Sequence, residues 1–339
     1  MVVSFLHTEK VVNMPKNPIL YIGGPGYSYE NFAPMIDQVS DHFDEILKLL
    51  KINSPDGKQV QIKLFVEVAT PETIRAYAVR VSKNPNVYEI RMTAGLSYHL
   101  WLASRALASD VQYLNWINKI KILDPKQKKR GRKELLADYA YYLASYLILL
   151  HEISHVVLGH CDYVQDEMGF SALDEFEDEK KVLTDKEIRI RRAFEAEADR
   201  QAGEFLTGFF ESSLGDRGLG THIQFPSRKH VYEFYTYGVT LVFVLLQQLT
   251  QRKGAIHPKP NERQYIVVSA LSKYFEKYKP EQLRLIHDHA VLTMIKAAKK
   301  TGLIEGSDPI KVMQNAISLA FVDDVVKETN IREYQLILS

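Results

Sequence analysis

The sequence has little of several features that would assign a protein class at once. It holds one cysteine among 339 residues, Cys161, so no disulfide can form within the chain. A disulfide-stapled secreted domain is therefore excluded, and the chain fits a reducing compartment. Neither sign of charge is in excess, because 43 lysines and arginines face 42 aspartates and glutamates. The net charge of +1 gives no electrostatic reason to expect a nucleic-acid partner.

Long hydrophobic runs are also missing. The two most apolar stretches, 139–150 and 234–246, are shorter than the roughly 20 residues that a membrane-spanning helix needs. We expect both to be buried helices. The first residues, MVVSFLHTEKVV, lack the basic region, the long apolar run and the small-residue cleavage site of a signal peptide. The chain is therefore expected to be a soluble cytoplasmic protein with no membrane span.

What the sequence does contain is clear periodicity. Alternation of polar and apolar residues predicts strands at 59–68, 75–81 and 87–93, the last of them at a sheet edge. Apolar residues at helical spacing predict a larger number of helices. These helices lie at 31–52, 96–122, 134–160, 186–210, 231–250 and over much of 261–339. The fold class is therefore α+β and mostly helical. The predicted regions are an N-terminal α+β region at 1–130, catalytic helices at 131–265 and a helical C-terminal region at 266–339.

The string HEISH at 151–155 indicates the chemistry. Residues four apart lie on one face of a helix, because each residue turns the helix by about 100°. His151 and His155 can therefore present two imidazole nitrogens to one zinc ion, and Glu152 can take a proton from zinc-bound water. The alternative is a pair of histidines on a solvated face. The preceding apolar run, YLASYLILL, argues against that alternative because it would bury the helix.

A catalytic zinc needs a third protein ligand and one open position. On a continuous helix, His160 lies about 180° from His151, which predicts a packed or capping histidine. The later string FEAEADRQA places Glu195 and Asp199 on one helix face, while Glu197 faces elsewhere. Glu195 can then bind the metal while Asp199 accepts a hydrogen bond from the far nitrogen of a ligand histidine. The alternative is an ordinary charged helix face, with these acids paired to nearby arginines. Cys161 is expected to be a small packed residue.

A peptidase also needs a donor for the oxyanion that develops in the transition state. His257, in HPKPNER at 257–263, is one candidate. Spacing alone does not separate it from its competitors. These are His222, His230, Tyr232, Tyr235 and Tyr237.

Taken in order, the motifs resemble a known family. HEISHVVLGH, FEAEADRQA and HPKPNER follow one another as in the gluzincin zinc peptidases that include the CAAX prenyl proteases and the Oma-type and HtpX-type proteases. Soluble relatives, among them the Lit-type phage-exclusion peptidases and the ImmA/IrrE regulators, resemble parts of the same pattern. The resemblance covers roughly residues 75–270.

The resemblance implies a zincin-like core, with a small sheet, an HExxH helix and a second helix that carries the glutamate ligand. It implies that His257 stabilises the oxyanion and that Arg263 supports His257 or the substrate. It also implies that the strand at 87–93 binds an extended peptide by strand addition, through Tyr88, Ile90 and Met92. The chain departs from the family in its lack of a membrane span and in an acidic insert at 162–181.

The predicted function is that of a soluble zinc-dependent endopeptidase with one Zn²⁺ per chain and a protein or peptide substrate. Two alternatives stay open. One is a non-catalytic binding or regulatory module on the same scaffold. The other is a nucleic-acid binder that uses the basic loop PKQKKRGRK at 125–133, and the near-neutral total charge makes this the weakest hypothesis.

Overall fold

The structure is a computed structural model of the chain. The residues that it describes are 29–67, 73–81, 86–109, 114–169, 173–174, 183–214, 222–250, 257–278, 290–298, 321–329 and 331–338. Within these residues the fold is α+β and mostly helical, as predicted. Half of the predicted acidic insert, at 170–172 and 175–181, lies outside the described residues.

The chain divides into two compact units, each assembled from separate stretches. The first unit consists of Met1–His99, His151–Phe194 and Val322–Ser339, and the second of Leu100–Leu150 and Glu195–Phe321. The three regions expected from the sequence are each continuous along the chain, whereas these two units are not. That division into three regions stays a prediction.

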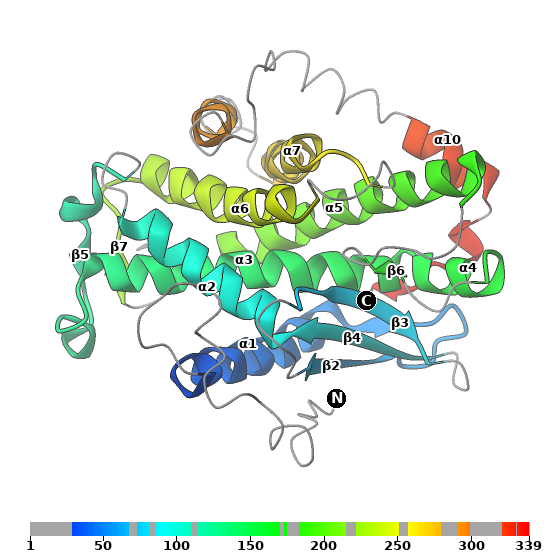
Figure 1. The fold of residues 1–339 in the computed structure, drawn as a ribbon, viewed down its shortest axis with the longest axis horizontal. Coiled ribbons are helices and arrows are strands. Elements are labelled where there is room, and N and C mark those ends of the chain that lie inside the picture. The colour runs from blue at the N-terminus through cyan, green and yellow to red at the C-terminus, as the bar shows by residue number, and fades with distance from the viewer. Residues whose placement is uncertain are drawn as a thin grey trace. The chain divides into compact units, whose positions relative to one another are not determined.

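The first unit contains a four-stranded sheet with the order β2-β4-β3-β6. Its strands are β2 (Gln61–Glu67), β3 (Ala76–Arg80), β4 (Val87–Thr93) and β6 (Leu173–Asp174). Strand β2 runs parallel to β4, whereas β3 is antiparallel to both β4 and β6. Figure 1 shows β2, β4 and β3 side by side. All three of the strands predicted from alternation are therefore present.

The prediction that the strand at 87–93 lies at a sheet edge is wrong. Strand β4 is hydrogen-bonded to β2 on one side and to β3 on the other. Alternation of side chains reports that one face of a strand is buried, and it carries no information about strand order. Among the described strands, β2 and β6 end the order of this sheet.

Helix α1 (Tyr29–Leu50) packs against β2. Ile36, Val39 and Phe43 are fully buried, and their spacing is that of the apolar face predicted for this helix. After α1, strand β1 (Ile52–Asn53) pairs with β8 (Ile337–Leu338) near the end of the chain. The C-terminal residues of the described chain therefore belong to the same unit as the sheet.

Helix α3 (Arg132–Val157) carries HEISH in its last two turns. The sequence predicts one helix over 134–160, but α3 ends at Val157 and α4 (His160–Asp166) follows at an angle of 56°. Gly159 lies between them with φ of 78°, a left-handed conformation that glycine adopts at little cost. The prediction of a continuous helix through His160 is therefore wrong.

The second unit is built from helices and a small strand pair. Helix α5 (Asp185–Leu214) enters this unit at Glu195, and α6 (Arg228–Thr250) packs against α7 (Pro260–Tyr278). At Gly203 in α5, a Cβ would lie 2.8 Å from the backbone oxygen of Val267 in α7, so glycine permits the close approach of these two helices.

The helix expected over 96–122 is shorter than predicted. Helix α2 (Ala94–Ser109) is followed by a 3₁₀ turn at Ile117–Lys119 and by β5 (Lys121–Ile122), which pairs with β7 (Ile223–Gln224). The remaining described elements are a 3₁₀ turn at Pro125–Gln127, a helical stretch at 290–298, α10 (Phe321–Glu328) and a 3₁₀ turn at Ile331–Tyr334.

The two apolar stretches at 139–150 and 234–246 lie in α3 and α6, and most of their side chains are buried, as predicted. In the part of the chain that the structure describes, no single helix is both long and apolar enough to cross a membrane. Helices α3 and α4 pass that test only together, as a bent pair.

Candidate metal centre

The HEISH string forms the end of α3, and all three of its predicted functional side chains are buried. His151, Glu152 and His155 are 4%, 1% and 1% exposed. The Nε2 atoms of the two histidines lie 3.0 Å apart. The helix therefore aims both Nε2 atoms at one point, as the spacing of four residues predicts.

Glu195 completes this group. One ligand atom from each of His151, His155 and Glu195 lies within 4.8 Å of the other two. Glu195 is 2% exposed and lies in α5, so two separate helices supply the three side chains. Two imidazoles and a carboxylate are common metal ligands, and this buried group can hold a metal ion.

Arg263 in α7 binds two carboxylates of α5. Its Nε and Nη2 atoms donate to Asp199 at 2.6 and 3.0 Å, in a bidentate pair. Nη2 also lies 3.3 Å from Oε2 of Glu195. Because Arg263 and Asp199 are 3% and 2% exposed, this pair fixes α5 to α7 with little screening by solvent. That Asp199 accepts a hydrogen bond from a ligand histidine stays a prediction.

His257 lies close to the same carboxylate. Its Nδ1 atom is 3.7 Å from Oε2 of Glu195, and its side chain is 18% exposed. Four of the five competing donors have other partners. Tyr232 donates a short hydrogen bond to Glu211, Tyr235 is hydrogen-bonded to Thr207, and His222 lies 3.0 Å from Asp124. His230 is hydrogen-bonded to Ser227.

His160 is a packed histidine, as predicted, but it lies beside the site instead of pointing away from it. Its Nδ1 atom lies 2.9 Å from Nδ1 of His155, and its ring stacks on Phe194 with the centroids 4.1 Å apart and the planes 5° from parallel. The prediction placed His160 on the far side of a continuous helix. The bend at Gly159 instead brings the side chain of His160 next to His155. The glycine directly before His160 was the sequence signal for a break in the helix.

A comparison with protein-family models decides the family. The model described as Peptidase U49 matches residues 80–278, which is more than half of the chain. The chain belongs to the peptidase U49 family. No curated protein and no solved structure matches the chain.

U49 is a family of Lit-type proteases, so the chain is a peptidase of this kind. The motifs of the chain resemble several peptidase families, and the U49 match supports the Lit-type family among them. The resemblance to the CAAX prenyl, Oma and HtpX proteases stays a prediction. The U49 match includes the His-His-Glu group and both His257 and Arg263.

The three residues expected to bind substrate also lie inside the U49 match, but they are buried. Tyr88, Ile90 and Met92 are 1%, 0% and 1% exposed. The hydroxyl of Tyr88 donates to Asp162 in α4 at 2.8 Å. These side chains belong to the core, and β4 is paired on both sides, so their expected position at a sheet edge is wrong.

The start of the acidic insert is part of the fold of this U49 chain. Asp162 is 4% exposed and accepts hydrogen bonds from Tyr88 and from Arg80 at 2.9 Å. Burial raises the pKa of Asp162, although both partners act in the opposite direction. Burial, together with the charge of Asp162, raises the pKa of the Cys161 thiol well above its usual range. The thiol therefore stays protonated at neutral pH, as a packed cysteine does.

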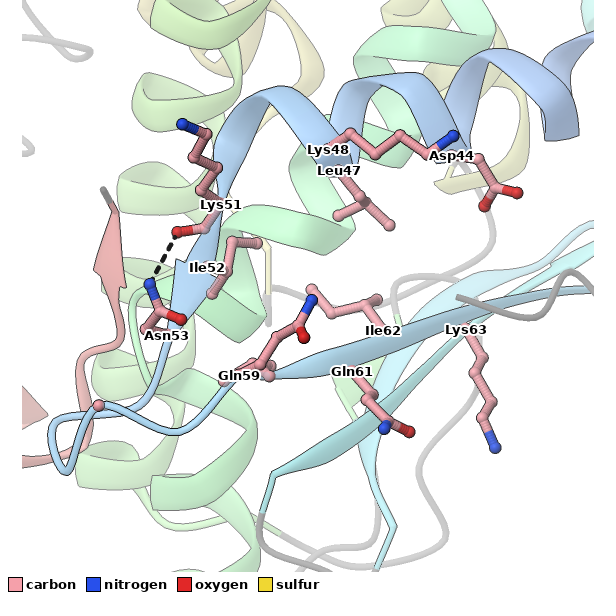
Figure 2. A pocket seen from close by; sticks show the side chains of 12 residues that line it. Asp44, Leu47, Lys48, Lys51, Ile52, Asn53, Gln59, Gln61, Ile62 and Lys63 are labelled. Carbon is pink, nitrogen blue, oxygen red and sulfur yellow. Dashed lines mark hydrogen bonds between the residues drawn. The ribbon is translucent and has the colours of Figure 1, made fainter.

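A hollow of about 710 Å³ lies outside the U49 match, where α1, β1 and the start of β2 meet. Figure 2 shows Lys48, Lys51 and Lys63 around it together with Asp44. None of the predicted site residues lines this hollow. The residues that the sequence predicts as metal ligands lie instead in the buried His-His-Glu group.

Proposed function

We propose that this U49 peptidase is a zinc-dependent endopeptidase with His151, His155 and Glu195 as the zinc ligands. The observation that carries the proposal is the buried group of three ligand atoms within 4.8 Å. Tetrahedral zinc with Zn–N bonds of about 2.05 Å holds its ligand atoms about 3.3 Å apart, close to the 3.0 Å between the two Nε2 atoms. Magnesium and calcium prefer oxygen ligands, so the two imidazoles favour a transition metal, and two histidines with one glutamate are a ligand set of catalytic zinc.

Each of the three ligands has a structural reason to stay in place. His151 and His155 lie on one face of the buried helix α3, and Arg263 contacts Glu195 while it holds Asp199. Zinc bound there would lower the pKa of a water molecule to about 7 and polarise the scissile carbonyl. Three protein ligands leave a fourth position for water or substrate.

Glu152 is proposed as the general base. It is adjacent to His151 in the chain and 1% exposed, so its carboxylate acts away from bulk solvent. It would accept a proton from the attacking water and pass that proton to the leaving amine. A general base of this kind contributes about 10²–10⁴-fold to the rate.

His257 is proposed to stabilise the oxyanion. Its Nδ1 atom lies 3.7 Å from Oε2 of Glu195, and its partial exposure leaves the ring accessible from outside. Arg263 is nearly fully buried and engaged by two carboxylates, so we assign it to positioning Glu195 and Asp199.

The proposed substrate is a protein, as for a family of peptidases. Binding by strand addition would use an edge strand of the sheet, and β4 lies between β2 and β3. Among the described strands, β2 offers such an edge, and the first residues of β2 also line the hollow in Figure 2.

The test compares cleavage by the wild-type chain with cleavage by Glu152→Gln in a cell lysate, with new protein termini identified by mass spectrometry. The matched control is Glu134→Gln, because Glu134 lies in the same helix but in an exposed pair with Arg130. The wild type and Glu134→Gln should produce the same new termini, and Glu152→Gln should produce none while it keeps its zinc.

Two results would contradict the proposal. Undiminished cleavage by a folded Glu152→Gln protein would remove Glu152 from the mechanism. Stoichiometric binding of a partner by the wild type, with no new termini at all, would favour the non-catalytic binding module.

A further inference from the structure

The second zinc ligand lies directly before a sharp bend. Helix α3 ends two residues after His155, and the left-handed Gly159 redirects the chain into α4. A Cβ at position 159 would lie 2.5 Å from the Cβ of Tyr334 and 2.7 Å from its backbone carbon. The segment around Tyr334 therefore packs directly on the bend, and only glycine fits beneath it.

Further contacts hold the bend in one conformation. The backbone nitrogen of Leu336 donates to the oxygen of Val157 at 2.9 Å, at the last residue of α3. On the other side, Asp162 accepts hydrogen bonds from Tyr88 and Arg80 of the sheet. The start of α4 is thus fixed from two directions by residues distant in sequence.

His160 is the first residue of α4 and is fully buried. Its Nδ1 atom faces Nδ1 of His155 at 2.9 Å. Its ring is held by parallel stacking on Phe194, which directly precedes the ligand Glu195 in α5. The imidazole therefore contacts one zinc ligand and the chain neighbour of another.

The contact dictates how the protons are placed. His155 aims its Nε2 atom at His151, so a metal bound there requires that Nε2 carry no proton. The neutral ring of His155 then carries its proton on Nδ1, and this N–H group donates a hydrogen bond to His160. His160 must accept on Nδ1 and hold its own proton on Nε2.

We propose that His160 is a positioning residue of the metal centre. It accepts a hydrogen bond from Nδ1–H of His155 and thereby fixes the tautomer and the ring orientation that leave Nε2 free for zinc. Partners of this kind to a ligand histidine are commonly carboxylates or carbonyls, and their loss lowers metal affinity about 10–100-fold. In this chain an imidazole takes that place. The inference rests on the proposed zinc site.

Two substitutions separate the hydrogen bond from the packing. His160→Phe keeps a ring for Phe194 but removes the acceptor. His160→Asn loses the ring but keeps an acceptor, because its Oδ1 branches from Cγ as Nδ1 does. The zinc dissociation constant of each purified full-length protein is measured by competition with a chromophoric chelator, and the melting temperature is measured without metal.

We expect His160→Phe to bind zinc about 10–100-fold more weakly than the wild type, and His160→Asn to bind within about threefold of it. A residue that only packs would give the reverse order, with Asn the weaker binder, and that result would overturn the inference. Equal zinc affinity for all three proteins would overturn it too. Absence of zinc binding by the wild type would instead contradict the proposed function.

The wild-type protein offers a second test that does not depend on how the variants fold. Nitrogen-15 spectra of the zinc-loaded chain, labelled at histidine, report which ring nitrogen carries the proton. We expect a protonated Nδ1 on His155 and an unprotonated Nδ1 on His160. A proton on Nδ1 of His160 would refute the inference.

Discussion

Removal of the Arg263 guanidinium should destabilise the protein strongly, and more so without zinc. Arg263 makes a bidentate pair with Asp199 at 2.6 and 3.0 Å and lies 3.3 Å from Glu195. The side chains of all three are 3–4% exposed. In Arg263→Met, two buried carboxylates lose a cation that water cannot replace. Removing one partner of a buried ion pair costs about 3–5 kcal/mol, so we expect the free energy of unfolding to fall by that amount.

Zinc should reduce this loss. With the metal bound at Glu195, one of the two carboxylates keeps a neighbouring cation even when Arg263 is absent. The difference between wild type and Arg263→Met should therefore be smaller in saturating zinc than in EDTA. Urea unfolding followed by circular dichroism, in both conditions, measures the two differences.

Arg200→Met is the matched control. Arg200 lies in α5 and pairs with Glu197 at 3.4 Å, but its side chain is 35% exposed. A pair that solvent screens to this degree contributes less than about 1 kcal/mol. If Arg263→Met lost no more stability than Arg200→Met, or if zinc made no difference to its loss, the described coupling of Arg263 to the metal centre would be refuted.

Three further predictions concern the site. Glu195→Gln should lower zinc affinity at least tenfold in isothermal titration, because it replaces an anionic ligand by a neutral one, and unchanged affinity would exclude Glu195 as a ligand. His257→Phe should lower kcat about 10²–10³-fold on a cleaved peptide and leave the zinc content unchanged, whereas a near-normal kcat would assign the oxyanion to another donor. Gly159→Ala should lose at least about 2 kcal/mol in urea unfolding, since the left-handed conformation alone costs about 1–2 kcal/mol and the methyl group meets Tyr334. A loss below about 0.5 kcal/mol would show that the bend is not constrained as described.

Local periodicity was sufficient to predict most elements. Strands β2, β3 and β4 and helices α1, α3, α5, α6 and α7 lie where alternation or helical spacing indicates them. The same spacing placed His151 and His155 on one face of α3, and the structure brings their Nε2 atoms together. These features depend on residues a few positions apart, which sequence patterns record directly.

The errors concern features that depend on distant residues. The interior position of β4 follows from its pairing with both β2 and β3, and alternation within a strand does not encode its neighbours. The return of His160 to His155 depends on one left-handed glycine, held beneath Tyr334 from far along the chain. The pairing of Arg263 with Asp199 and Glu195 also joins residues that are distant in sequence, and the role expected for Arg263, support of His257 or the substrate, stays a prediction.

The central claim is that one zinc ion is bound by two imidazoles from α3 and one carboxylate from α5. X-ray absorption at the zinc edge, combined with metal analysis of the purified chain, tests it most directly. We expect one zinc per chain, with two imidazole nitrogens at about 2.0–2.1 Å and oxygen in the remaining positions, and loss of this signature in Glu195→Gln. A chain that is folded and active without zinc, or a zinc ion with no imidazole ligands, would contradict it.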